Sequence, residues 1–267
     1  MEIKVQDYDT KTSYYLDHCE KRLVSNGGYI YETHTLLQKI GSVRGKSVMD
    51  LCCGNGRFGW TLIENGARSV VGVDISDAML ASALQKREQL PPQDQERVSF
   101  YRADLGNSDL ELEPVDLVTG LYVLHYADSP AALRRMGEFI RRHMKPGGHC
   151  AIVTLNPELR PDPNLRKAQS EMGVYIDLTD GPETTMRIGD FSCRLWRWPR
   201  EVIEEALAEA GLCEFTWTGR DVPADRPDLA EKYKYSIRHP HNVVLTARRA
   251  DDLGMVEVTP QRELEAA

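Results

Sequence analysis

Residues Val48 to Gly59 read V-M-D-L-C-C-G-N-G-R-F-G, and residues Val70 to Ser76 read V-V-G-V-D-I-S. The two stretches predict a buried strand, a glycine-rich turn, a helix and a second buried strand, and each strand ends in an aspartate (Asp50 and Asp74). Parallel strands that alternate with helices bind ligands at their carboxyl ends. The segment therefore indicates a nucleotide-type pocket and leaves the identity of its ligand open.

The alternation of strand and helix continues through most of the chain. Short runs rich in Val and Ile predict strands at residues 47–52, 69–73, 98–102, 115–121 and 149–155, with helices at 57–65, 76–90 and 130–144. A helix at 199–210 and strands at 214–218 and 242–247 follow. Apolar strands separated by helices are typical of a sheet that is covered on both faces. The pattern predicts an α/β, Rossmann-like, doubly wound sheet.

Three segments lie outside this alternation. Residues 1–44 contain two expected helices, at 10–25 and 30–40, and are interpreted as an N-terminal helical cap. Residues 156–198 are rich in Pro, Gly and aromatic side chains, and an apolar insertion of this length predicts a lid or a wall of the substrate site. The acidic tail at 251–267 is expected to be disordered.

Composition limits the possible partners. The 267 residues carry a formal net charge of −8 and a pI near 5.5, whereas a nucleic-acid surface needs clustered Lys and Arg, so no nucleic-acid partner is expected. The N-terminus lacks the apolar core of a signal peptide and no apolar run reaches membrane-spanning length, which predicts a cytoplasmic protein without membrane contact. Six cysteines without a C-x2-C pair predict free thiols and no metal site. We expect a monomer or a homodimer.

The glycine turn can be interpreted in two ways. Gly54-Asn-Gly56-Arg-Phe-Gly59 formally fits the dinucleotide fingerprint, with Asp74 near the position of a ribose-binding acid. Asp50 argues against a dinucleotide because its carboxylate would repel a pyrophosphate, whereas it would attract an ammonium group. Asp104, after the third strand, adds a carboxylate near a possible adenine site. A cationic amino-acid end, a ribose and a base are the three parts of S-adenosylmethionine.

These stretches, together with FYRADL (100–105), DLVTGLYVLHY (116–126) and MKPGGH (144–149), resemble class I S-adenosylmethionine-dependent methyltransferases. The resemblance covers about Gly45 to Leu155, and FTWTG (215–219) and NVVLTAR (242–248) resemble the last strands of that family. It implies a methyltransferase domain over residues 45–250, with a seven-stranded, mostly parallel sheet whose last strand is antiparallel. Cys52 stands where the family has its first glycine, which is tolerable if this position does not need a positive φ.

The resemblance also implies a cofactor site. Asp50, Gly54 and Gly56 would hold the methionine end, Asp74 the ribose hydroxyls, and Asp104 the adenine. The complete set implied to bind the cofactor is Tyr14, Asp50, Cys52, Gly54, Asn55, Gly56, Phe58, Gly59, Asp74, Ile75, Met79, Ala103, Asp104, Leu105, Leu121 and Tyr122.

Polar and aromatic side chains outside the glycine turn are the candidates for the site of the methyl acceptor. His125 and Tyr126, after the fourth strand, and Tyr15, in the N-terminal cap, are the candidate catalytic residues, although each could equally be a packing residue. Tyr29, Tyr175, Trp196 and Trp198 are candidates for the wall of an aromatic acceptor pocket, or for the core of a lid.

The expected function is methyl transfer from S-adenosylmethionine to a small, aromatic or heteroaromatic metabolite of natural-product biosynthesis. Nitrogen is favoured as the acceptor atom, followed by an aromatic carbon such as an indole position. The D-I-S-D-A-M run and the F-S-C-R-L-W-R-W segment resemble small-molecule methyltransferases, nearest to the toxoflavin-type azapteridine N-methyltransferases. A nicotinamide-dependent oxidoreductase and a non-catalytic cofactor-binding protein are the alternatives.

Overall fold

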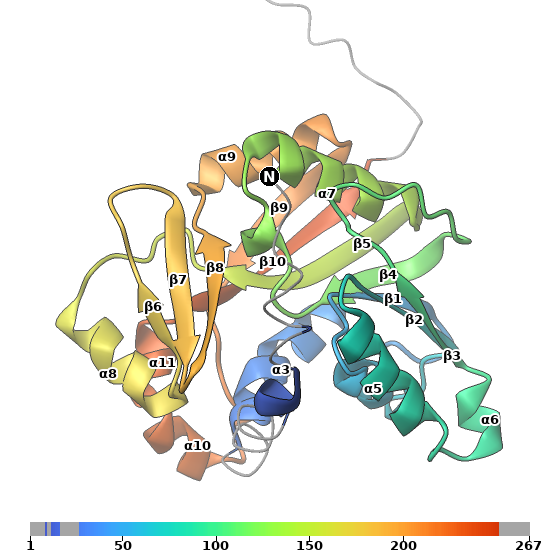
Figure 1. The fold of residues 1–267 in the computed structure, drawn as a ribbon, viewed down its shortest axis with the longest axis horizontal. Coiled ribbons are helices and arrows are strands. Elements are labelled where there is room, and N and C mark those ends of the chain that lie inside the picture. Colours follow the sequence, from blue (N-terminus) through green and yellow to red (C-terminus); the bar gives the residue numbers. More distant parts are fainter. Residues whose placement is uncertain (1–8, 10–11, 17–26, 251–267) are drawn as a thin grey trace, which may run out of the picture.

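A seven-stranded sheet runs through the centre of the molecule (Figure 1). The computed structural model describes residue 9 and residues 12–16 and 27–250. The strand order is β3-β2-β1-β4-β5-β10-β9. The strands are β1 (Ser47–Leu51), β2 (Ser69–Asp74), β3 (Val98–Arg102), β4 (Val115–Gly120), β5 (Met144–Leu155), β9 (Leu212–Thr218) and β10 (Asn242–Arg249).

The direction of the strands confirms the expected fold class. The first five strands pair in parallel, and β10 runs antiparallel to both of its neighbours, β5 and β9. The order reverses between β1 and β4, where the crevice outside the strand ends accommodates ligands in open α/β sheets. β5 begins at Met144 rather than at the expected residue 149, with an irregularity in its pairing to β4 near Val115.

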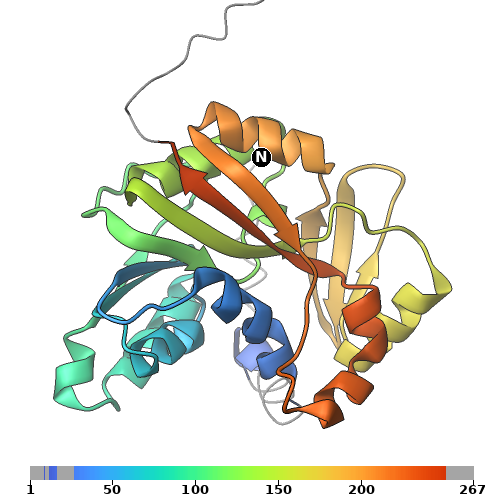
Figure 2. The same cartoon turned by 180° about the vertical axis from the view of Figure 1, so that it is seen from behind.

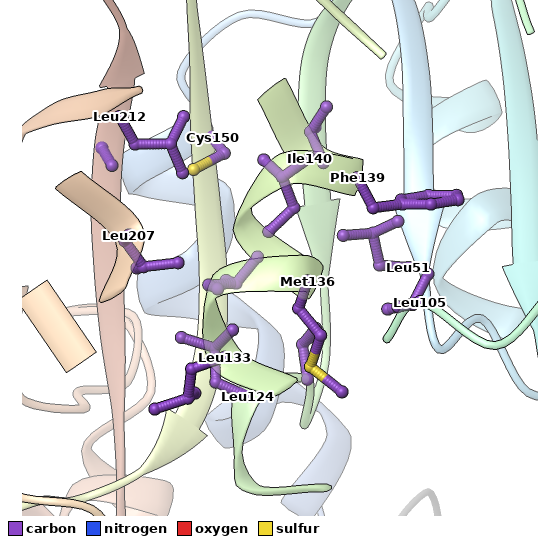
Figure 3. Packing of buried hydrophobic residues seen from close by; sticks show 14 of the residues in the cluster. Leu51, Leu105, Leu124, Leu133, Met136, Phe139, Ile140, Cys150, Leu207 and Leu212 are labelled. Atoms are coloured by element: carbon purple, nitrogen blue, oxygen red, sulfur yellow. The ribbon is translucent and has the colours of Figure 1, made fainter. Parts of the chain in front are cut away.

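Helices cover both faces of this sheet (Figures 1 and 2). They are α3 (Gly28–Ile40), α4 (Arg57–Glu64), α5 (Asp77–Arg87), α6 (Pro92–Gln95), η2 (Leu124–Tyr126), α7 (Pro130–Arg142) and α9 (Arg200–Glu209). On one face, Leu133, Met136 and Ile140 of α7 and Leu207 of α9 pack together with strand residues such as Leu51 (Figure 3). On the other face, α3 and α4 bury a second cluster against the sheet.

Sequence signals account for where two of these helices begin. The Ser76 hydroxyl accepts a hydrogen bond from the Met79 amide at 3.2 Å, which caps α5. Ser129 caps α7 in the same way, and Pro130 occupies the first helical position, where no backbone donor is needed.

The 156–198 insertion forms an ordered module beside the sheet. It contains α8 (Pro163–Met172) and a three-stranded antiparallel sheet of β6 (Tyr175–Asp177), β7 (Glu183–Ile188) and β8 (Phe191–Trp196). A second excursion, between β9 and β10, adds α10 (Pro227–Lys232) and α11 (Lys234–Arg238), which share one buried cluster with the insertion. The accessory module therefore comes from two separate segments, of which only the first was expected.

Membrane-spanning helices and metal-binding groups can be searched for in the described residues. No helix among them combines the length and apolar character needed to cross a membrane. Within the same part of the chain, His, Cys, Asp and Glu side chains form no group of three or more that could hold a metal ion. The tail at 251–267 and most of the expected helix at 10–25 lie outside the described residues.

Candidate active site

The glycine turn between β1 and α4 is held tightly against β2. Gly54 and Gly56 have φ angles of 52° and 77°, in the left-handed region that glycine enters without steric cost. A Cβ on Gly56 would lie 2.8 Å from the ring of Phe100, so this position has no room for a side chain. The Gly54 amide donates a hydrogen bond to Oδ2 of Asp74 at 2.8 Å. The turn and the end of β2 therefore form one rigid wall.

Cys52 adopts the left-handed conformation that favours glycine. Its φ is 51°, so the first glycine position of the family pattern does take a positive φ in this chain. A side chain in this region costs roughly 1–2 kcal/mol, because Cβ approaches the following carbonyl oxygen. The condition under which a cysteine would be tolerated here without strain is therefore not met, and Cys52 is a strained position at the edge of the turn.

Asp50 and Asp74 give the site its electrostatic character. Asp50 is buried, and burial, reinforced by the charge of Asp74, raises its pKa well above the usual range, while the Gly59 amide partly offsets this rise. Burial also raises the pKa of Asp74, against the effect of backbone amides that include those of Ser76 and Gly54. A bound cation would stabilise the ionised form of both carboxyl groups. The site is suited to a positively charged ligand and unsuited to a pyrophosphate.

Other predicted cofactor residues surround this wall at different depths. Met79 is buried next to the turn, about 4.0 Å from a Cβ placed on Gly54, and Ile75 is partly exposed. Asp104 accepts the Gly106 amide at 2.9 Å, while Ala103 and Leu105 on either side are buried in the hydrophobic core.

Three more predicted cofactor residues play identifiable structural parts in the turn and the start of α4. Phe58 packs into the cluster beneath α3 and α4, Asn55 accepts the Arg57 amide at 3.3 Å, and a Cβ on Gly59 would approach Val70 to 3.3 Å. These contacts support the wall from behind, so direct contact with a cofactor remains a prediction for all three.

The end of β4 presents a strained tyrosine. Tyr122 has a φ of 66°, and its hydroxyl donates a hydrogen bond to Oε1 of Glu32 on α3. Burial raises the pKa of both groups, so neither ionises readily. Leu121 beside it is half-buried. The contact fixes the Tyr122 ring at the switch point, next to the position expected for the sulfonium.

His125 is held by the backbone rather than left free for proton transfer. The Leu155 amide donates to its Nδ1 at 3.2 Å, and burial lowers the pKa of His125 to about 3. A neutral ring whose Nδ1 is an acceptor carries its proton on Nε2, so it can donate a hydrogen bond there but cannot act as a base. Its geometry favours a positioning part, in ring contact with Tyr126 at 4.6 Å, over general-base chemistry.

The N-terminal tyrosines reach across to the accessory module. The hydroxyl of Tyr14 accepts the Asp190 amide at 2.9 Å, at the turn between β7 and β8, and Tyr15 contacts the Phe191 ring edge-on at 5.5 Å. Tyr29 instead lies by α4, where its hydroxyl is 2.9 Å from that of Thr61. Tyr15 thus lies against the accessory module, whereas Tyr29 lies beside α4, next to the predicted cofactor site.

The module presents different side chains from those expected. Cross-strand pairing places Tyr175 and Trp196 on the face of the three-stranded sheet opposite to Phe191, Cys193 and Leu195. It is the Phe191 face that packs against Tyr14, Tyr15 and Tyr126. The structure therefore does not bring Tyr175 and Trp196 into the site, because alternate residues of a strand point to opposite faces.

Trp198 follows β8 and serves to join the module to the central sheet. Its indole nitrogen donates to the Ala127 carbonyl at 2.8 Å, and its ring packs on the core under α7. This contact anchors the end of the insertion next to η2 and the end of β4.

Two charged residues at the site were missed by the sequence argument. Glu32 and Arg220 are 6% and 3% exposed, and they approach the end of β4 from α3 and from the segment after β9. No local motif marks them, since their positions depend on the packing of distant segments. The sequence offered one usable signal for them: the carboxylate of Glu32 stands among apolar positions of the expected helix at 30–40.

The order of the strands, the single antiparallel strand and the aspartates at the switch point define the class I, Rossmann-like methyltransferase fold. S-adenosylmethionine fits the residues present: Oδ2 of Asp50 is buried without a hydrogen-bond partner in the described part of the chain, and a Cβ on Gly54 would meet only the Met79 sulfur, at 4.0 Å. Arg57, at the start of α4, lies over the Tyr29 ring at 5.5 Å and marks the end of this wall.

Comparison with known proteins agrees with this class. Residues 48–148 match the model of a family described as a methyltransferase domain. Among solved structures, an S-adenosylmethionine-dependent methyltransferase from Mesorhizobium loti superposes with a TM-score of 0.58 at 23% identity, covering 82% of this chain and 98% of the other. DesVI from Streptomyces venezuelae superposes with a TM-score of 0.59 at 16% identity, covering 87% and 97%. Residues 48–148 therefore match a methyltransferase domain, and the two solved structures share the fold of the chain.

Curated relatives share only part of their length with this chain. A tRNA U34 carboxymethyltransferase from Pseudomonas aeruginosa is 34% identical over 128 residues, which is 44% of this chain and 38% of the relative. A demethylmenaquinone methyltransferase from Lactococcus lactis subsp. lactis is 32% identical over 126 residues, 46% and 48% of the two chains. The chain thus spans less than half the length of these relatives, whose names include both a nucleic-acid and a small-molecule acceptor. The expected absence of a nucleic-acid partner is not supported by the first of them.

Proposed function

We propose that the whole chain is a methyltransferase that transfers a methyl group from S-adenosylmethionine to a small aromatic or heteroaromatic metabolite. The observation that carries the donor half is the pair of carboxyl groups, buried Asp50 and half-buried Asp74, on either side of a glycine turn in which Gly56 has no space for a side chain. A nicotinamide dinucleotide would place its pyrophosphate against these carboxylates. The oxidoreductase alternative is disfavoured for that reason.

The chemistry asked of this chain is mainly orientation. S-adenosylmethionine, when bound, supplies a methyl group that is already activated by the sulfonium charge. The wall of Gly54, Gly56 and Asp74 holds the donor, and Tyr122, fixed by Glu32, limits where the acceptor can approach. Correct alignment of the two reactants can lower a barrier by several kcal/mol. A nitrogen or electron-rich carbon acceptor needs no general base, in agreement with the neutral, backbone-bound His125.

A small acceptor is favoured over tRNA by charge and by enclosure. The net charge is −8, and the acceptor side is bounded by buried Glu32 and by Phe191 of the accessory module. Phosphate backbones bind through clustered Lys and Arg. The demethylmenaquinone enzyme shows that a named relative of similar identity acts on a small molecule. An azapteridine-like nitrogen acceptor, as in the toxoflavin-type enzymes, remains our finer proposal.

Donor binding is tested by calorimetry with S-adenosylhomocysteine and with NADH. We expect S-adenosylhomocysteine to bind and NADH not to bind, and Asp74→Ala to weaken S-adenosylhomocysteine at least tenfold, because a charge-assisted hydrogen bond to the ribose is lost. Asp77→Ala is the matched control, since Asp77 is an exposed acid three residues further on, paired with Arg102. NADH binding in place of S-adenosylhomocysteine would refute the proposal.

The acceptor arm follows methyl transfer by mass spectrometry with the same protein. Indoles, azapteridines and a transcribed tRNA are offered separately under identical conditions. We expect methylation of a heteroaromatic small molecule and none of the tRNA. Methylation of the tRNA alone would overturn the small-molecule assignment, and donor binding without transfer to any acceptor would favour the non-catalytic alternative.

A further inference from the structure

Arg220 is a buried cation with unused hydrogen-bonding capacity. Its Nη2 donates to the Tyr31 carbonyl at 3.2 Å, and the guanidinium lies over the Tyr31 ring, 5.4 Å from its centroid. Its Nε and Nη1 have no hydrogen-bond partner among the described residues, although the side chain is 3% exposed. A buried guanidinium without an anionic partner is costly, so this arrangement favours a negatively charged ligand.

Strand direction places Arg220 on the acceptor side of the site. β9 runs parallel to β5, because both are antiparallel to β10. Thr218, Val244 and Val153 are level across the three strands, so the residues that follow β9 emerge at the edge where β4 and β5 end. Arg220 lies there with Tyr122, whereas the ribose-binding Asp74 ends β2, on the other side of β1.

The charged groups around Arg220 leave it without an ion pair. Glu32 is a buried carboxyl group near Arg220; it accepts the Tyr122 hydroxyl, and the charge of Arg220 only partly counters the rise in its pKa that burial causes. Oδ1 of Asp221 accepts the Val222 amide. None of the ion pairs formed by the described residues includes Arg220.

A second polar side chain shares this place. His241, which precedes β10, is 3% exposed, and its Nδ1 has no partner among the described residues. Burial, aided by the charge of Arg220, lowers the pKa of His241 to about 4, so the ring is neutral at pH 7. A neutral imidazole can donate from Nδ1 without adding charge. Arg220 and His241 together can thus bind a group with one negative charge and more than one acceptor oxygen.

We propose that Arg220 and His241 bind the carboxylate of the acceptor, which makes the substrate a small aromatic or heteroaromatic acid. This inference rests on the proposed function and adds the substrate class. A monoanion fits better than a phosphate dianion, because Arg220 supplies one positive charge and the His241 ring is neutral. The Tyr31 ring, stacked on Tyr233 at 5.1 Å, fixes the guanidinium for this contact.

The test compares benzoate with benzamide, which have the same shape and differ in charge. Both are titrated calorimetrically into the full chain, with and without saturating S-adenosylhomocysteine. We expect benzoate to bind at least tenfold more tightly than benzamide, and Arg220→Gln to abolish this difference. Arg226→Gln is the control, because Arg226 is an exposed arginine paired with Asp228 at 2.7 Å, and it should leave benzoate binding unchanged.

Each outcome has one meaning. A benzoate affinity less than tenfold above that of benzamide, or one that Arg220→Gln does not change, overturns the carboxylate subsite. Inorganic phosphate binding as tightly as benzoate also overturns it. If Arg220→Gln does not fold, the benzoate-to-benzamide ratio of the wild type decides. Absence of S-adenosylhomocysteine binding would instead contradict the proposed function. The titration of benzoate and benzamide without S-adenosylhomocysteine would still test the anion site.

Discussion

Two single residues at the site are held in strained backbone conformations. Cys52 and Tyr122, both at strand ends, have positive φ angles without being glycine. Strained positions of this kind persist when the surrounding structure determines them, and they cluster at functional sites. Their location at the ends of β1 and β4 supports the switch point as the reacting centre.

Replacing Cys52 with glycine is expected to stabilise the protein. Glycine tolerates the left-handed conformation, so the free energy of unfolding should rise by about 1 kcal/mol, which for a chain of this size raises Tm by roughly 2–4 °C. Thermal unfolding followed by circular dichroism measures the change. Cys53→Gly is the control: Cys53 is buried and does not have a positive φ, so Tm should fall. A lower Tm for Cys52→Gly would show that the strain argument is incorrect.

His125 should make the free energy of unfolding depend on pH between about pH 6.5 and pH 3. Its pKa is lowered to about 3 in the folded state, against about 6.5 in an unfolded chain, so the unfolded state binds the extra proton between these values. The contribution of His125 to the free energy of unfolding is fully present above about pH 6.5, and it is lost as the pH falls towards 3. Between pH 7 and pH 5 the loss is about 2 kcal/mol.

The measurement compares urea unfolding of wild type and His125→Asn at pH 8, 7 and 5. The asparagine keeps an acceptor for the Leu155 amide but cannot ionise. The wild type should lose about 2 kcal/mol relative to the variant on going from pH 7 to 5, and almost nothing between pH 8 and 7. A difference that stays constant down to pH 5 would rule out a buried, neutral histidine.

Among the elements, β8 links the accessory module to the rest of the site. Phe191, Cys193 and Leu195 point towards the buried cluster that also contains Tyr31 and Tyr233. The Trp198 indole then ties the end of this segment to Ala127, next to η2. The module thus packs on this side through the face of its sheet that carries Phe191, while the Gly54 amide of the glycine turn is bonded directly to Asp74 of β2.

Truncating Phe191 should loosen the module selectively. The side chain is fully buried, so Phe191→Ala is expected to cost about 3–5 kcal/mol through lost burial and the cavity left behind. Hydrogen exchange read by mass spectrometry should show faster exchange in β6 to β8, while β1 and β4 stay protected. Leu84→Ala, at an exposed position on α5, is the control and should change neither region. Uniformly faster exchange would mean that module and sheet unfold as one unit.

At the scale of the whole molecule, much of the fold could be predicted from local patterns. The starts of all seven strands except β5 and β9 were expected at the observed residue, because apolar runs bounded by Gly, Pro or Asp mark buried strands directly. Asp50, Asp74 and the glycine turn lie together for the same reason, since consecutive strand ends meet at one edge of the sheet. These features concern the methyl donor.

The acceptor side was less predictable because it is assembled from distant segments. The sequence marked the 156–198 insertion by its aromatic content, but it could not say that Phe191 would face the site and that Tyr175 and Trp196 would face away. That choice depends on cross-strand register, which a shift of one residue reverses. The second excursion, which carries α10 and α11, gave no composition signal that distinguished it from a surface loop.

The sheet, its switch point and the acidic donor wall can be predicted without the structure, since they follow from short-range periodicity and from residues adjacent to strand ends. The folded structure alone shows that Cys52 is strained, that His125 accepts the Leu155 amide, and that Glu32 and Arg220 each lie near Tyr122. Each of these depends on contacts between segments separated by tens to nearly two hundred residues along the chain. Such contacts arise from packing of the whole core, for which no local pattern exists.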